Sequence, residues 1–134
     1  MLLLISSLLL MSCGADKYMK KGEKFLALGE YYDAAYQFKQ AYTRTPVKER
    51  DTRGKRALKM AQCYQRINAT PKAIAAYRNA IRYNQASKED QLAYARQLLK
   101  NGDYRQAEKV FLMLKDSMPG NQLVANGLKS AQMA

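Results

Sequence analysis

The feature that most constrains this chain of 134 residues is a pattern that recurs along it. Residues 29–46, 68–85 and 102–119 align with one another, with the first two segments 39 residues apart and the last two 34 apart. The five additional residues fall within the polar stretch 47–52, where a longer loop is expected. Self-similarity at a period of this size is typical of a protein that stacks copies of one supersecondary unit.

Each segment repeats the same order of small and large side chains. A turn residue that tolerates the left-handed backbone conformation comes first, and it is Gly29, Asn68 or Gly102. A small–large–small series follows at spacings of four and three, which places its members on one face of a helix. The three series are Ala34, Phe38 and Ala41; Ala73, Tyr77 and Ala80; and Ala107, Phe111 and Leu114.

This pattern resembles the tetratricopeptide repeat (TPR) over residues 15–119, nearly all of the chain after its first segment. The resemblance implies an all-α, TPR-type helical-hairpin solenoid with three repeats plus a C-terminal capping helix. The repeats would span about 15–48, 54–87 and 88–121, with the cap at 122–134, because an open solenoid end must be covered. Helices are expected near 16–28, 31–44, 53–67, 71–83, 88–100, 104–116 and 122–132. Gly22 would allow the two helices of the first repeat to approach closely.

Several aromatic and sulfur-containing side chains fall at the spacing of a helical core rather than of a ligand site. We therefore expect packing roles for Met60, Tyr64, Tyr77, Tyr94 and Met113. Cys63, beside Tyr64, is expected to be a lone buried thiol.

Composition argues against catalysis. The chain has no His, which removes the usual triad base and the commonest zinc ligand. It has no Gly-rich phosphate-binding loop, and no pair of carboxylates stands in a plausible cleft. We expect neither enzymatic activity nor a bound metal or cofactor.

The first segment is apolar over residues 2–11 except at Ser6 and Ser7. Its length is about half of what a membrane-spanning helix needs and suits the apolar region of a signal peptide. The four residues Leu-Met-Ser-Cys at 10–13 resemble the lipobox of bacterial lipoproteins. That resemblance implies a signal peptide at 1–12, lipidation of Cys13, and Gly14 as a sign of an outer-membrane, periplasm-facing location in a Gram-negative bacterium. The alternative is a buried N-terminal helix in which Cys13 is incidental.

A second resemblance extends from this lipobox into the first repeat. The stretch GADKYMKKGEKFLALGEYYDAAYQFKQAY is similar to the start of OmpA-family outer-membrane lipoproteins, some of which serve the type IX secretion machinery. In that family a TPR region precedes a β-propeller and a peptidoglycan-binding domain. This sequence ends at Ala134, before either one, so the resemblance implies the protein–protein interaction module alone and carries no peptidoglycan binding.

The net charge of +12 favours an anionic partner. TPR arrays line a concave groove with the first helix of each repeat, and here those helices carry mostly basic and polar residues. We predict a partner-binding groove for an acidic protein or peptide segment, formed by Lys20, Glu23, Lys55, Lys59, Gln62, Arg66, Arg96 and Lys100. The alternatives are a solvated helix face, or a basic helical-repeat binder of nucleic acid in the cytoplasm.

Overall fold

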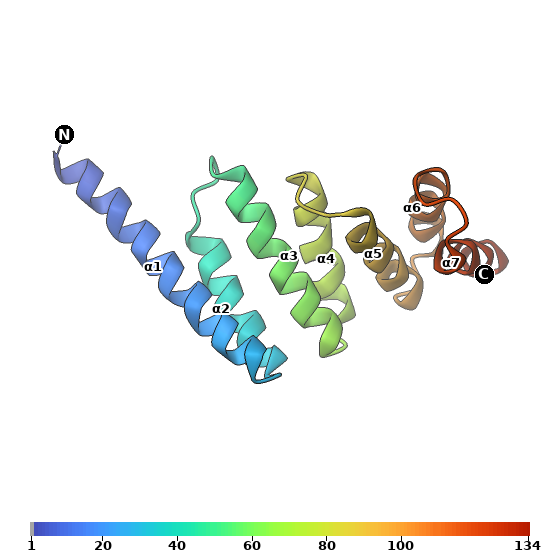
Figure 1. Ribbon diagram of the computed structural model, residues 1–134, viewed down its shortest axis with the longest axis horizontal. Helices are drawn as coiled ribbons and strands as arrows, with labels where there is room; N and C mark the ends of the chain where they lie inside the picture. The colour runs from blue at the N-terminus through green and yellow to red at the C-terminus, as the bar shows by residue number, and fades with distance from the viewer. Residues whose placement is uncertain (1) are drawn as a thin grey trace.

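The computed structural model describes the backbone of residues 2–134 and the side chains of residues 14–134. Its seven helices follow one another in a single row, with antiparallel neighbours joined by short turns, as Figure 1 shows. They are α1 (Leu2–Ala27), α2 (Tyr31–Arg44), α3 (Arg50–Arg66), α4 (Thr70–Arg82), α5 (Lys88–Lys100), α6 (Tyr104–Ser117) and α7 (Gln122–Met133). The expected all-α solenoid of three helical hairpins and a final helix is confirmed.

Four of the turns share one hydrogen-bonding scheme at the end of the preceding helix. The C-termini of α1, α3, α4 and α5 each close with two backbone hydrogen bonds, such as Glu30 N to Phe25 O at 2.9 Å and Gly29 N to Leu26 O at 3.0 Å. This scheme needs one residue with positive φ, and the chain supplies Gly29, Asn68, Asn84 and Gly102. The turn residues expected from the repeat pattern are therefore confirmed, and Asn84 adds a fourth.

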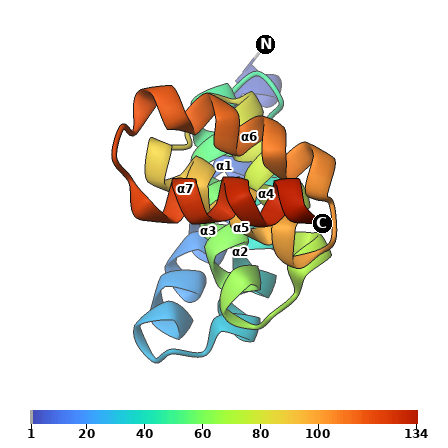
Figure 2. The same cartoon turned by 90° about the vertical axis from the view of Figure 1, so that its right-hand side faces the viewer.

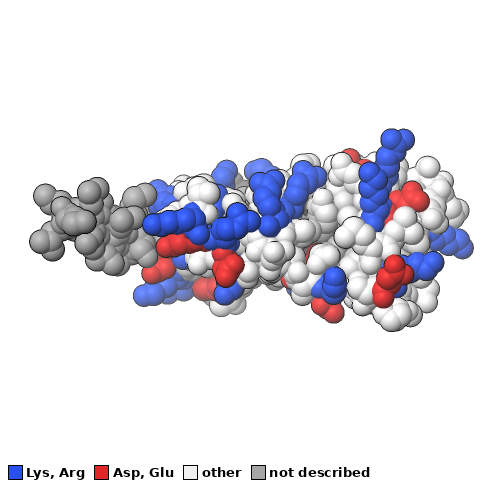
Figure 3. Space-filling model, turned by 90° about the horizontal axis from the view of Figure 1, so that it is seen from above, with Lys and Arg blue, Asp and Glu red and all other residues white. Residues whose placement is uncertain are grey.

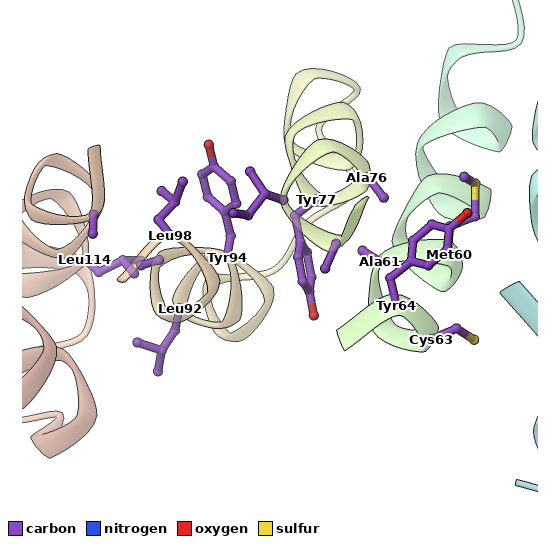
Figure 4. Close-up of a cluster of buried hydrophobic side chains, with 14 of the residues drawn as sticks. Met60, Ala61, Cys63, Tyr64, Ala76, Tyr77, Leu92, Tyr94, Leu98 and Leu114 are labelled. Carbon is purple, nitrogen blue, oxygen red and sulfur yellow. The ribbon is translucent and has the colours of Figure 1, made fainter. Parts of the chain in front are cut away.

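The repeat pattern also accounts for the core. Eight of the nine side chains in the three small–large–small series are at most 1% exposed, and Tyr77 is 2% exposed. The ring centres of Tyr77 on α4 and Tyr94 on α5 are 6.5 Å apart. Figure 4 shows their hydroxyl groups pointing in opposite directions, with Leu98 and Leu114 on the α6 side. Met60, Tyr64, Tyr94 and Cys63 are buried as expected.

Two glycines let helices touch where any side chain would collide. A Cβ placed on Gly22 of α1 would overlap the ring of Phe38 on α2. A Cβ placed on Gly127 of α7 would overlap the ring of Phe111 on α6 in the same way. The expected role of Gly22 is confirmed, and the final helix repeats that device.

Two expectations need correction. Helix α3 begins at Arg50, so residues 50–52 of the stretch 47–52 that was predicted as loop are helical, and the connection covers residues 45–49. Asp51 in its first turn favours this early start, because a carboxylate is stabilised at a helix N-terminus. Met113 is 68% exposed, because it lies between the inward-facing Phe111 and Leu114 on the opposite side of α6.

Arginine and tyrosine side chains fasten the end of the first hairpin to the second. The guanidinium of Arg53 donates to Thr45 O at 2.7 Å and to Tyr83 Oη at 3.3 Å. It also lies 4.3 Å from the ring centre of Tyr42. One side chain on α3 therefore holds α2 and the end of α4 together.

The row of helices is covered at each end. α1 packs on α2, while α7 packs on α6 and also contacts α5. Figure 2 looks along the row from its C-terminal end, with α7 at the front. Within the described residues, no helix combines the length and apolarity needed to cross a bilayer. The side chain of Cys13, the expected lipidation site, lies outside the described residues.

Candidate partner-binding groove

The first helices of successive repeats and the final helix enclose an open groove of about 670 Å³, here called the C-terminal groove. Helices α3, α5 and α7 form its walls. Gln65 lies in the last turn of α3, and Asn68 lies in the turn that follows this helix. Its lining contains no Asp or Glu. The lining residues are Gln65, Asn68, Ala93, Arg96, Gln97, Leu99, Lys100, Leu123, Asn126, Gly127 and Ser130.

Two amide side chains of this groove, those of Gln65 and Asn68, are oriented by neighbours that donate hydrogen bonds to their oxygen atoms. Tyr77 donates its hydroxyl hydrogen to Gln65 Oε1 at 2.6 Å, and Lys100 Nζ donates to Asn68 Oδ1 at 2.7 Å. The NH₂ groups of both amides are left as donors. Burial raises the pKa of Tyr77 to about 12, so its hydroxyl stays protonated and continues to donate well into the alkaline range.

Gln97 lines the same groove but is largely buried. The residue is only 7% exposed, and its Oε1 atom is buried without a hydrogen-bond partner among the described residues. A buried amide oxygen without a donor is unfavourable. The groove surface therefore offers mainly donors, which suit carboxylate or carbonyl oxygens.

A second, smaller hollow of about 460 Å³ lies toward the N-terminus. It is lined by Leu26, Tyr31, Gln62, Gln65, Arg66 and Tyr77. The guanidinium of Arg66 stands 5.4 Å from the ring centre of Tyr31. Because Gln65 lines both hollows, they are adjacent along the helices that the sequence assigned to the groove.

The structure divides the predicted site residues into sets. Arg96 and Lys100 line the C-terminal groove, and Gln62 and Arg66 line the smaller hollow. Lys59 Nζ forms an ion pair with Glu23 Oε1 at 2.7 Å, which reduces the positive charge at that level.

The other two predicted residues lie apart from these hollows. Lys20 lies on α1 among other lysines, away from both hollows. Lys55 is exposed on α3 and lines neither hollow. Their membership of a partner site stays a prediction.

Sequence reasoning missed Gln65, Asn68, Gln97, Asn126 and Ser130. The period of 34 could have found some of them, because Gln62, Arg96 and Ser130 hold the same place in successive helices. The same register joins Cys63, Gln97 and Ala131, all of which are buried. The predicted groove used a single row of side chains on each first helix. The lining of the C-terminal groove also includes side chains from the neighbouring rows, such as Gln65 and Gln97.

Comparison with known proteins gives structural matches only. The sequence matches no family model and no curated protein. The first TPR of Spaghetti (RPAP3) bound to the HSP90 peptide SRMEEVD superposes with a TM-score of 0.69 at 17% identity, covering 91% of this chain and 93% of that one. The second TPR domain of human RPAP3, in complex with the HSP70 peptide SGPTIEEVD, gives 0.69 at 14% identity, covering 93% and 98%.

A third match is the TPR2B domain of yeast Sti1 in its Hsp70 complex, with a TM-score of 0.65 at 13% identity, covering 90% of this chain and 98% of that one. These three domains and the present chain share an architecture over almost their whole lengths. The fold is therefore that of a TPR domain, as the repeat pattern implied.

Proposed function

We propose that this chain is a TPR scaffold that binds an acidic segment of a protein partner in the C-terminal groove. The observation that carries the proposal is the chemistry of the lining, which presents cationic and amide donors without an opposing carboxylate. The structurally similar RPAP3 domains are solved with peptides that end in Glu-Glu-Val-Asp.

The binding test compares two synthetic heptapeptide libraries, one containing Asp and Glu and one with Asn and Gln in their places. The full chain should retain the acidic library preferentially. Reversing Arg96 and Lys100 to Glu should weaken this binding by about a hundredfold or more, since each charged contact contributes about 1.5–3 kcal/mol. Equal retention of the two libraries by the unmodified chain contradicts the proposal.

A matched control removes the same charge from the opposite side of the solenoid. Arg82→Glu with Lys109→Glu alters two exposed residues on α4 and α6 and should leave binding nearly unchanged. Arg78 is less suitable, because its guanidinium contacts Tyr94 Oη at 3.4 Å. If both double variants lose binding equally, the attraction is a general effect of net charge. Stronger retention of nucleic acid than of acidic peptide would favour the alternative reading of the basic surface.

The proposal includes a location. Lipidation of Cys13 would hold the scaffold on the periplasmic side of an outer membrane, in an assembly of the kind served by OmpA-family or type IX secretion lipoproteins. The support is the lipobox-like sequence at 10–13 and the apolar run before it. Two or more acyl chains give stable attachment.

The mass of the mature protein from a Gram-negative host tests this location. It should correspond to residues 13–134 plus acyl chains, and Cys13→Ala should abolish both processing and membrane fractionation. An unprocessed, unlipidated chain would contradict the anchor and would leave the peptide-binding test unaffected.

A further inference from the structure

Four lysines occupy the outward face of α1, at the N-terminal end of the solenoid. Lys17, Lys20, Lys21 and Lys24 follow the spacing of one helix face, and all four are exposed. We call them the lysine stripe. They line a shallow surface hollow of about 420 Å³ together with Asp16. Among the described residues, none of the four is within ion-pair distance of a carboxylate.

The two acidic residues of this part of α1, Asp16 and Glu23, form ion pairs with α3. Asp16 Oδ1 pairs with Arg56 Nη2 of α3 at 3.2 Å, and Glu23 pairs with Lys59 of the same helix at 2.7 Å. Both carboxylates are therefore engaged on the side of α1 that faces α3. Asp16 borders the lysine stripe, but its charge is paired with Arg56, so the four lysines are the charges of this face that stay unpaired among the described residues.

A helix that only closes a solenoid does not need such a charge. α7 closes the other end with the sequence QLVANGLKSAQM, in which Lys129 is the one charged residue. Its exposed positions are otherwise neutral, and they include Gln122, Asn126 and Gln132. A solenoid end can therefore have a polar surface without a stripe of like charges. Like charges three or four residues apart on a helix repel one another and destabilise it.

We propose that the lysine stripe is a docking surface for anionic lipid headgroups and lays α1 along the membrane plane. The inference deepens the proposed membrane attachment and rests on it. Ammonium groups suit lipid phosphates as point charges, and a polybasic segment beside an apolar anchor is held by the negative surface potential of the bilayer. The apolar residues 2–11 and Cys13 directly precede the stripe in the sequence. Figure 3 shows basic side chains, with acidic ones beside them, on the part of the surface next to the residues drawn in grey.

The rise of the helix fixes the orientation. At about 1.5 Å per residue, Lys17 lies about 6 Å along the axis from Cys13 and Lys24 lies about 16 Å from it. Electrostatic attraction at physiological salt decays over about 8 Å. An upright α1 would keep only the first lysine close to the headgroups, whereas a helix lying on the surface engages all four. The row of helices then extends away from the bilayer, and α7, which lines the C-terminal groove, lies at its far end (Figure 1).

The test uses the full chain with Cys13→Ala, so that no acyl chain contributes, and vesicles of phosphatidylcholine with or without phosphatidylglycerol. Changing the four stripe residues to Gln should lower binding to the anionic vesicles by at least about tenfold. A control with Lys39, Arg82, Lys109 and Lys115 changed to Gln has the same net charge and should keep most of that binding. Neutral vesicles should not distinguish the two variants.

Two results would overturn the proposal. Equal losses in both variants would assign the attraction to net charge, and unchanged binding by the stripe variant would remove the stripe from the contact. Because all eight residues are exposed, circular dichroism should show that both variants remain folded. A missing lipid at Cys13 would alter the mass of the mature protein without altering this assay, so the two proposals fail separately.

The orientation is tested with an environment-sensitive fluorophore on one introduced cysteine. In the Cys13→Ala chain, Cys63 is 1% exposed and should not react. A label at Lys24→Cys should shift its emission to the blue on anionic vesicles, whereas a label at Lys129→Cys should not. A shift at both positions or at neither would contradict a helix lying on the surface.

Discussion

The two ends of this solenoid solve the same packing problem with different surfaces. α1 and α7 each cover one end of the row, and each has a glycine against a phenylalanine ring of its neighbour. The outward faces of the two helices differ in charge. α1 carries the lysine stripe, and α7 has a single charged residue.

This difference separates what the fold requires from what it permits. A terminal helix must bury one face and present a polar surface on the other. α7 meets that requirement with neutral side chains, so a concentrated positive charge is not a condition of folding. The charge on α1 therefore calls for a functional explanation, which the contact with anionic lipids provides.

The largest expected effect tests whether the two ends are packed alike. Gly22→Val and Gly127→Val each place a branched side chain into the ring of Phe38 or Phe111. Overpacking of this kind costs about 1–3 kcal/mol, and the helices would have to separate to relieve it. We expect both variants to lose stability in urea by similar amounts. A near-neutral Gly127→Val would show that α7 is a loosely attached cap and would end the comparison.

Gly14→Ala is the matched control for these substitutions. No atom lies within 4 Å of a Cβ at Gly14, and the residue is inside α1. Replacing glycine by alanine within a helix contributes up to about 1 kcal/mol of stability. A loss of stability in this control would show that replacing a glycine of α1 destabilises the chain even without a clash. The losses at Gly22 and Gly127 could then not be assigned to their contacts with the phenylalanine rings.

The core positions could be predicted from the sequence, because the same order of small and large side chains recurs in each of the three repeats. Phe38, Tyr77 and Phe111 recur at fixed places among small residues, and three agreeing copies identify the face that packs. Met113 was assigned wrongly to the core, because side-chain type alone does not separate it from its inward-facing neighbours two residues before and one residue after.

The groove was less predictable, since its residues are defined by distances between helices. The sequence indicated Arg96 and Lys100 as basic positions on one helix face. It gave no sign that Tyr77, from a different helix, would orient Gln65, or that Gln97 would be buried without a partner for its oxygen. The ion pair of Lys59 with Glu23 could not be predicted from the sequence either, because it depends on how closely α1 and α3 approach each other.

An effect of intermediate size is expected at alkaline pH, where ionisation of the Cys63 thiol on α3 should lower the free energy of unfolding. Cys63 and Gln97 hold equivalent places, but only the thiol can ionise. Burial raises the pKa of Cys63 from 9.0 to about 11, with Lys59 acting in the opposite direction and Glu23 adding to the rise. The unfolded chain therefore releases this proton first.

The thiol's contribution to stability is complete below pH 9 and is lost as pH rises through about 11. Its slope is at most about 1.4 kcal/mol per pH unit. Urea unfolding of the Cys63→Ala variant should show a smaller decline than the unmodified chain from pH 9 toward 10, the range below the ordinary pKa of 10.0 for Tyr77. Parallel curves for the two proteins would mean that the thiol is accessible to solvent when folded.

The smallest effect bears most directly on why the two ends differ. Lys21 lies three residues from Lys24 and four from Lys17, so Lys21→Glu converts two repulsive pairs into attractive ones. An opposite-charge pair stabilises, and a like-charge pair destabilises, by about 0.2–0.5 kcal/mol at low ionic strength, so the variant should be more stable than the unmodified chain by up to about twice that amount per pair. Lys129→Glu on α7 has no charged residue at these spacings on its helix and should change stability far less. High salt should remove the gain, because exposed charges are screened. A gain at α1 without one at α7 would mean that the lysines are kept at the expense of folding stability, as expected for residues that serve a contact outside the fold. If Lys21→Glu is neutral or destabilising at low salt, the lysine stripe imposes no cost on folding, and the surface of α1 needs no lipid contact to explain it.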